Sequence, residues 1–232
     1  MNFNWNSDTI RWYQEANKYT GFFKNIAGLI APRLAGYSTF CDVGCGLGIV
    51  DLELSKYVRS ITCIDINKEA IAALKESIKD RKITNIETRL MDCDAIDESW
   101  DVIYISFFGS RNLEEFLPHC KKLIAVVGKK NQSELFPEKY RAFQKNTADQ
   151  AEQSLFQKKI PYALSEASFE FGQPLASIKD AQNFVMAQSH GISPEDLASF
   201  LSQRLIETGE KQYPFFIPRV KSMGIFEIKG DL

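Results

Sequence analysis

The sequence predicts one α/β domain built on a mainly parallel β-sheet. From residue 39 onward, short runs rich in β-branched residues alternate with longer runs of helical pattern, which is typical of parallel strands joined by crossover helices. The 232 residues are 44% hydrophobic and 25% charged, an ordinary globular composition that can bury one sizeable core. A glycine-rich turn after the first of these runs marks the place where a ligand is expected.

Charge and cysteine content exclude several classes of protein. A formal net charge of -2 and a pI near 5.8 give no general attraction to nucleic acid or to an anionic membrane. The five cysteines are scattered without a CxxC pair, and there are two histidines, so we expect reduced thiols, no metal site and a cytoplasmic protein. The polar start lacks the pattern of a signal peptide, and the apolar stretch 26–35 is too short to span a membrane.

The chain divides into three consecutive parts of the expected domain. Residues 1–36 form an N-terminal helical cap, in which Ser7 and Asp8 precede a helical run that ends near Pro32. Residues 37–128 form the core, with strands at 39–43, 60–65, 86–90, 102–106 and 123–127 and helices at 49–57, 68–79 and 113–119.

Residues 129–232 form the C-terminal part of the same domain. The polar segment 129–159 is expected to be helical, followed by a strand at 160–171 and a helix at 178–188. Ser193 before Pro194 is a capping pattern, which predicts a helix over 197–206. Residues 213–228 form the last strand. The long insertion 129–212 is expected to cover the acceptor site.

Three glycines follow the first expected strand directly. At Gly44, Gly46 and Gly48 the absent side chains let the backbone turn tightly and approach a ligand. A dinucleotide site also fits this context, but its third glycine comes one residue later, where this chain has Ile49. The shorter GxGxG spacing favours a nucleoside without a pyrophosphate, and Asp42 before the first glycine suits a ligand with an ammonium group.

Acidic residues follow the next two expected strands. Asp65 ends the second strand, where a carboxylate accepts hydrogen bonds from ribose hydroxyls. Asp92 follows the third strand at the carboxyl edge of the sheet, where ligands bind in open α/β folds. Asp92 can accept a hydrogen bond from an adenine amine, or it can simply cap a helix or sit in a loop.

The glycine loop and the two acids together resemble the class I S-adenosylmethionine-dependent methyltransferase family over residues 39–127. The resemblance implies a Rossmann-like, seven-stranded and mostly parallel sheet with helices on both faces and an antiparallel strand pair at its edge. It also implies that S-adenosylmethionine is the cofactor. The cofactor-binding residues are then Asp42, Gly44, Cys45, Gly46 and Gly48 for the methionine part, Asp65 for the ribose, Ile66, Asp92 and Cys93 for the adenine, and Ser106 at the end of the strand that Asp101 opens.

One feature of the family's amine- and amide-methylating members is missing. Those proteins carry an Asn or Asp before Pro-Pro after the fourth strand, whereas this chain has Ser106, Phe107 and Phe108 there. A small-molecule acceptor is therefore favoured over nucleic acid, and the two phenylalanines can shape its pocket.

Aromatic residues near the N-terminus allow two interpretations. They can form a lid over the cofactor, which we favour for Trp12 and Tyr13, or they can pack in the core, which we favour for Phe22 and Phe23.

We therefore expect a methyltransferase that works by direct displacement, aligning the acceptor with the sulfonium methyl and excluding water. The sequence identifies no catalytic residue, leaves any general base unknown and does not indicate an oligomeric state. Two other classes remain open. One is an NAD(P)-dependent oxidoreductase, and the other is a non-catalytic nucleotide-binding protein.

Overall fold

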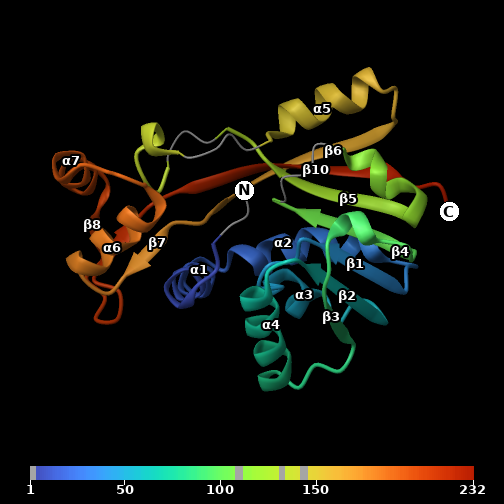
Figure 1. Cartoon of the computed structure of the whole chain (residues 1–232), viewed down its shortest axis with the longest axis horizontal. Coiled ribbons are helices and arrows are strands. Elements are labelled where there is room, and N and C mark those ends of the chain that lie inside the picture. The colour runs from blue at the N-terminus through green and yellow to red at the C-terminus, as the bar shows by residue number, and fades with distance from the viewer. Residues whose placement is uncertain (1–3, 108–111, 131–133, 142–145) are drawn as a thin grey trace. The chain divides into compact units, whose positions relative to one another are not determined.

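The computed structural model of the chain describes residues 4–107, 112–130, 134–141 and 146–232 (Figure 1). Its α-helices are α1 (Ser7–Thr20), α2 (Phe22–Ile30), α3 (Ile49–Leu54), α4 (Lys68–Asp80), α5 (Ala148–Gln157), α6 (Ile178–Gln188) and α7 (Pro194–Arg204). Its strands are β1 (Thr39–Val43), β2 (Ser60–Asp65), β3 (Ile86–Leu90), β4 (Trp100–Ser106), β5 (Cys120–Gly128), β6 (Tyr162–Glu170), β7 (Gln173–Leu175), β8 (Ile206–Glu207), β9 (Phe215–Ile217) and β10 (Val220–Lys229).

These elements belong to two compact units. Unit 2 consists of residues 23–129, 146–167 and 223–232, and unit 1 consists of residues 1–22, 130–145 and 168–222. No helix in the described parts of either unit is both long and apolar enough to cross a membrane.

A seven-stranded sheet carries the order β3-β2-β1-β4-β5-β10-β6 (Figure 1). The first five of these strands pair in parallel, and β10 runs antiparallel to β5, with Met223 opposite Gly128. The predicted Rossmann-like, mostly parallel sheet is therefore confirmed, as is the antiparallel strand near its edge. The bounds of β1, β2 and β3 coincide with the predicted runs.

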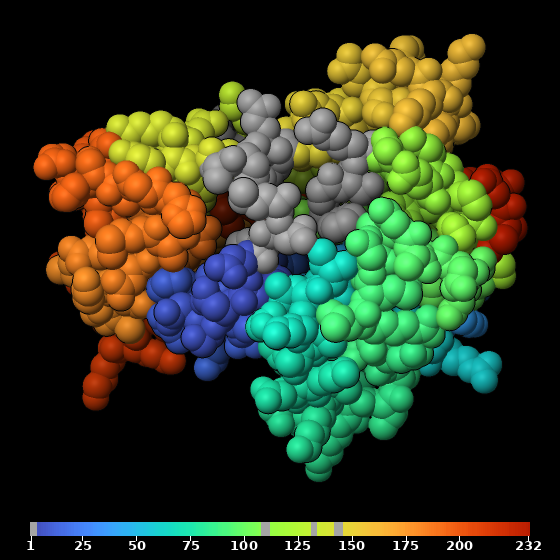
Figure 2. Space-filling view, viewed as in Figure 1, coloured from blue at the N-terminus to red at the C-terminus, as the bar shows by residue number. Residues whose placement is uncertain are grey.

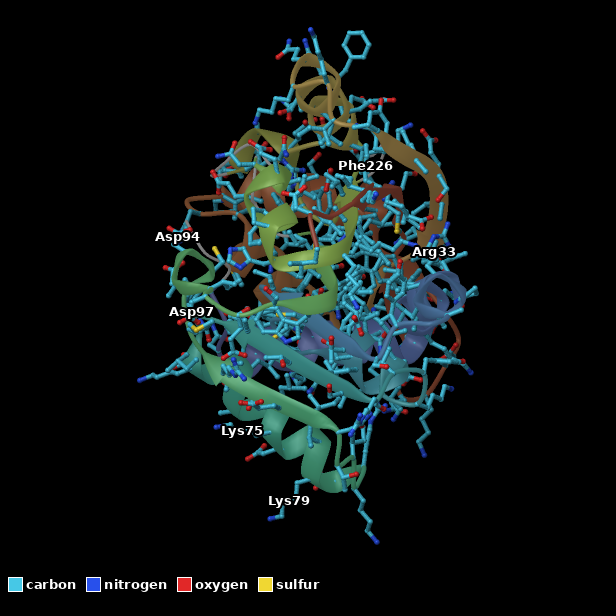
Figure 3. The ribbon with its side chains drawn as sticks, turned by 90° about the vertical axis from the view of Figure 1, so that its right-hand side faces the viewer. Arg33, Lys75, Lys79, Asp94, Asp97 and Phe226 are labelled. Atoms are coloured by element: carbon cyan, nitrogen blue, oxygen red, sulfur yellow. The ribbon has the colours of Figure 1, made fainter. Side chains whose placement is uncertain are left out.

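Helices cover both faces of this sheet. On one face, Cys41, Val43 and Ile105 pack in a buried cluster with residues of α5 and of the 3-10 helix Leu113–His119. On the other face, Asp42 contacts Asp51 of α3, and α3 packs against α4. In Figure 3, Phe226 of β10 lies in the interior, whereas Lys75 and Lys79 of α4 extend outward.

Helix α4 lies on the face seen in Figure 2 (teal), and β3 is an edge strand of the sheet. On this edge, Arg89 forms ion pairs with Glu87 and Glu98, each at 2.8 Å. Charged side chains on an edge strand oppose pairing with another chain. At the opposite side of the sheet, Arg33 bonds Glu227 of β10 at 2.9 Å (Figure 3).

Several helices differ from those predicted. The N-terminal run is broken at Gly21, whose left-handed φ of 66° ends α1, and its cap is Asn6 and not Ser7 or Asp8. Residues 113–119 form a 3-10 helix, which contains Pro118 next to its last residue.

The C-terminal part also differs in detail. Within the described part of 129–159, the α-helix is α5, which begins after the capping residue Thr147. The expected strand over 213–228 is two strands, β9 and β10, because Pro218 between them has no amide hydrogen for a ladder. The Ser193 cap is confirmed by its bond from the Asp196 amide at 3.1 Å.

Unit 1 contains a second sheet that the sequence did not predict, with the order β7-β9-β8. Its strands have two or three residues, too few to show an alternating pattern. Trp12 lies in the core of this unit with 4% of its surface exposed, and its Nε1 donates to Asp180 at 3.0 Å. The prediction that Trp12 forms a lid is therefore wrong, whereas the core positions of Phe22 and Phe23 are confirmed.

Candidate cofactor site

The glycine loop begins directly after β1 and is fastened to the end of β2. The amides of Gly44 and Cys45 donate to the carbonyl of Ile64 at 2.8 and 3.0 Å. All three predicted glycines have left-handed φ values, 74° at Gly44, 55° at Gly46 and 57° at Gly48. This conformation is strained for residues with a Cβ atom, so the loop depends on glycine for its shape.

Gly48 has a second, steric requirement. A Cβ atom at this position would lie 2.6 Å from both methyl carbons of Leu74, a fully buried residue of α4. The glycine thus lets α4 approach the loop closely.

We expect Gly48→Ala to lower the free energy of unfolding by about 1–3 kcal/mol, from the left-handed φ together with overpacking against Leu74. Urea denaturation measures the change. Gly36→Ala should cost less, because Gly36 has a φ of 85° but nothing within 4 Å of its added Cβ. Gly28→Ala, inside α2 with open space around it, should cost nothing. Equal losses for Gly48→Ala and Gly36→Ala would contradict the packing argument.

Asp65, the last residue of β2, holds two segments of backbone. Its Oδ2 accepts from the Gly46 amide and its Oδ1 from the Asn67 amide, each at 2.8 Å. Its own carbonyl accepts from the Met91 amide at 3.0 Å, which draws the end of β3 to the same place. Each carboxylate oxygen keeps a further lone pair, so Asp65 can accept ribose hydroxyls while it fixes the loop.

Beneath the loop lies a pair of buried carboxyl groups, which the sequence alone does not reveal. Asp42 is 2% exposed and Asp51 is fully buried, and their side chains contact each other. Among the described residues, no donor pairs with Oδ1 of Asp42 or with either oxygen of Asp51. Two adjacent carboxyl groups of this kind hold their protons more tightly than exposed acids, because two buried like charges repel each other strongly.

Burial and neighbouring charges shift the pKa values of Asp42, Asp51 and the adjacent thiol of Cys45. Burial, followed by the charge of Asp51, raises the pKa of Asp42 well above its ordinary value. Burial also raises the pKa of Asp51 to about 7, although contacts with Asp42 and Cys63 act in the opposite direction. The pKa of Cys45 is lowered by its bond with Cys63 but raised overall by burial and by the nearby acids. Both thiols therefore stay protonated beside the loop.

The segment after β3 carries Asp92 and Cys93. Asp92 is exposed and accepts the Asp94 amide at 3.1 Å, so it caps the 3-10 helix Cys93–Ala95. Asp94 and Asp97 lie at the outer side of unit 2 (Figure 3), and both are exposed. Ile66, which directly follows β2, is 48% exposed, so its apolar surface is available at this edge.

The residues at the end of β4 lie at the same edge of the sheet as the glycine loop. The Oγ of Ser106 is buried without a partner among the described residues. Phe107 adopts a left-handed φ of 55° and donates its amide to Val126 at 2.8 Å. Such strain in a residue with a side chain often accompanies a functional site. Phe108 lies outside the described residues.

Asp101, at the opposite end of β4, has a structural role. Its carboxylate accepts the amides of Ser38 and Thr39 at 2.7 and 3.0 Å and pairs with Lys121 at 2.7 Å. The Lys121 ammonium and these amides lower the pKa of Asp101 to about 2. Asp101 therefore fastens the start of β1 to the start of β4, away from the edge that carries the glycine loop.

Most of the predicted site residues lie together at the carboxyl ends of β1 to β4. They are Asp42, Gly44, Cys45, Gly46, Gly48, Asp65, Ile66, Asp92, Cys93 and Ser106. Tyr13 belongs to unit 1, where it packs edge-on against Trp5 and Phe171, and its role as a lid stays a prediction. Asp51 could have been noticed as an acid inside the apolar run 49–54.

The fold and the site are those of a nucleotide-binding α/β protein. Similarity to known proteins indicates which kind of nucleotide-binding protein this is. Residues 40–128 match the family model described as a methyltransferase domain. A probable cobalt-precorrin-6B C(15)-methyltransferase (decarboxylating) from Methanococcus maripaludis is 30% identical over 81 residues, 35% of this chain and 45% of that protein. The match thus spans less than half of this curated relative.

Solved structures share the fold over most of the chain. The YcgJ protein from Bacillus subtilis superposes with a TM-score of 0.58 and 13% identity over 89% of this chain and 98% of that one. The [4+2]-cyclase SpnF gives a TM-score of 0.54 and 14% identity, covering 90% and 81% of the two chains. Residues 40–128 therefore match a methyltransferase domain, and the solved structures show that the chain shares their fold.

Proposed function

We propose that the protein transfers a methyl group from S-adenosylmethionine to a small-molecule acceptor. The observation that carries this proposal is Asp65, which bonds the glycine loop and still presents acceptor lone pairs at the strand end. Buried polar atoms without partners, Oδ1 of Asp42 and Oγ of Ser106, fit a polar ligand at the same edge. The methyltransferase domain and its relatives support the same cofactor.

Each residue at the edge has a place in this proposal. Asp42 and the loop hold the methionine part, Asp65 the ribose, and Ile66, Asp92 and Cys93 the adenine. When bound, S-adenosylmethionine supplies an electrophilic methyl group on a sulfonium. The chain contributes alignment of the acceptor and exclusion of water, with Tyr13 and residues 129–212 as the covering segments. Residues 1–36 and 129–232 accordingly flank the cofactor-binding core 37–128.

A small molecule is the proposed acceptor for two reasons. The net charge of -2 gives no general attraction to nucleic acid, and Ser106 and Phe107 stand where base-methylating members of the family carry their motif. The name of the curated relative, a precorrin methyltransferase, agrees with a small acceptor. We also propose that the protein is cytoplasmic and that it has no membrane partner.

Calorimetric titration of the full chain tests the cofactor. We expect S-adenosylmethionine and S-adenosylhomocysteine to bind with micromolar dissociation constants and NAD not to bind. Binding of NAD with no binding of the sulfur nucleosides would favour an oxidoreductase and overturn the proposal. Formation of S-adenosylhomocysteine with a panel of small acceptors then separates an enzyme from a non-catalytic nucleotide-binding protein.

A further inference from the structure

Arg219 of unit 1 is a partly buried arginine at the turn between β9 and β10. Its Nε donates to the carbonyl of Phe171 at 3.1 Å, and its own carbonyl accepts the Phe171 amide at 2.7 Å. Its guanidinium carbon lies 5.3 Å from the centre of the Phe171 ring. These contacts fix the orientation of the guanidinium group.

Arg219 has no ion-pair partner among the residues that the structure describes, and its terminal nitrogens make no bond to them. Glu134, the acid near it, is paired with Arg141 at 2.8 Å. The segments outside the description, 1–3, 108–111, 131–133 and 142–145, contain no Asp or Glu. A partly buried guanidinium without a counter-ion is uncommon, because removing a charge from water is costly.

The surroundings of Arg219 are aromatic and positively charged. Tyr13 lies edge-on to Phe171 at 5.4 Å, and Phe22 stacks on Phe171 at 4.3 Å. The Lys221 ammonium lies 5.6 Å from the same ring. Burial lowers the pKa of Arg219 to about 10, so the group remains charged at neutral pH. Aromatic walls around a fixed guanidinium suit a small organic anion, because the planar fork of arginine matches carboxylate and phosphate oxygens.

We propose that Arg219 binds the carboxylate or phosphate group of a small organic anion, which Tyr13 and Phe171 flank. The identification of this anion as the methyl acceptor rests on the proposed function. The two terminal nitrogens are the groups that contact the anion, and the bond from Nε to Phe171 positions them.

NMR of the arginine Nε–H signals tests this site in the full chain without cofactor. The signal of Arg219 is assigned by its loss in Arg219→Lys, or by through-bond correlation to its backbone. Benzoate and phenyl phosphate serve as the anions and benzamide as the neutral control. Arg33, which is paired with Glu227 in unit 2, reports general salt effects.

We expect a saturable shift of the Arg219 signal with a dissociation constant below about 10 mM for at least one anion, and no such shift with benzamide or at Arg33. A response to phenyl phosphate alone shows that the site binds phosphate groups, and a response to benzoate alone shows that it binds carboxylate groups. No shift with either anion, or equal shifts with benzamide, overturns the site. If Arg219 responds but S-adenosylmethionine does not bind, the proposed function fails and the anion site stands. If S-adenosylmethionine binds but Arg219 does not respond to either anion, the anion site fails and the proposed function stands.

Discussion

The Asp65→Ala variant should bind S-adenosylhomocysteine at least about 100-fold more weakly than the wild-type protein, a loss of about 3 kcal/mol. Two effects combine in this variant. The ribose hydroxyls lose a charged acceptor, and hydrogen bonds to charged groups contribute about 1.5–3 kcal/mol. The Gly46 and Asn67 amides also lose their partner, so the glycine loop is less well ordered before the cofactor arrives.

Calorimetry on matched variants separates these effects. Asp97→Ala removes an exposed acid of unit 2 and should leave the affinity unchanged. Asp65→Asn keeps one carbonyl acceptor but no charge, and should fall between wild type and Asp65→Ala. Unaltered binding by Asp65→Ala would remove Asp65 from the site and with it the main support for a ribose ligand.

The second large effect concerns pH and the buried pair of Asp42 and Asp51. The pKa of Asp51 is about 7 in the folded protein and near 3.8 when unfolded, so the folded state binds more protons. This contribution to stability is complete below pH 3.8 and is lost as the pH rises through 7. One unit of pKa difference corresponds to about 1.4 kcal/mol, so the loss of wild-type stability between pH 5 and pH 8 should be large enough to measure.

Asp51→Asn should therefore gain stability relative to wild type as the pH rises from 5 to 8, because asparagine can donate to Asp42 without losing a proton. Urea denaturation at several pH values measures the difference between the two proteins, which cancels the titration of all other groups. Glu53→Gln on the same helix removes a carboxylate in a surface ion pair with Arg81 and should show no such trend. A difference between Asp51→Asn and wild type that is independent of pH would contradict the raised pKa of Asp51.

The central strands of the sheet were predictable because their residues are mostly buried. The run 60–65 contains the closely spaced β-branched residues Ile61, Thr62 and Ile64, which favour a strand, and its limits agree with the structure. The 3-10 helix Leu113–His119 was read as an α-helix because apolar spacing alone does not distinguish the two. The second sheet escaped prediction because its strands of two or three residues are too short to show an alternating pattern.

In the candidate site, too, features next to strand ends were predictable, whereas features defined by tertiary contacts were not. The glycine loop and Asp65 are local signals, since each adjoins a strand end in the sequence. Asp51 and Arg219 are defined by their tertiary surroundings. An acid in a helix is ordinarily exposed, and nothing in the sequence around Asp51 indicates that it meets Asp42. The lack of an ion pair at Arg219 within the described part of the chain is evident only from its tertiary contacts.

The place of β10 in the sheet also constrains how the protein folds. During synthesis, β5 is complete long before β10, its hydrogen-bonding neighbour, leaves the ribosome, because the whole of residues 129–219 comes between them. Until then β5 has an open edge of apolar strand, the kind of surface that aggregates or recruits chaperones. Closure of the sheet therefore depends on a contact between distant parts of the chain, and such contacts form slowly.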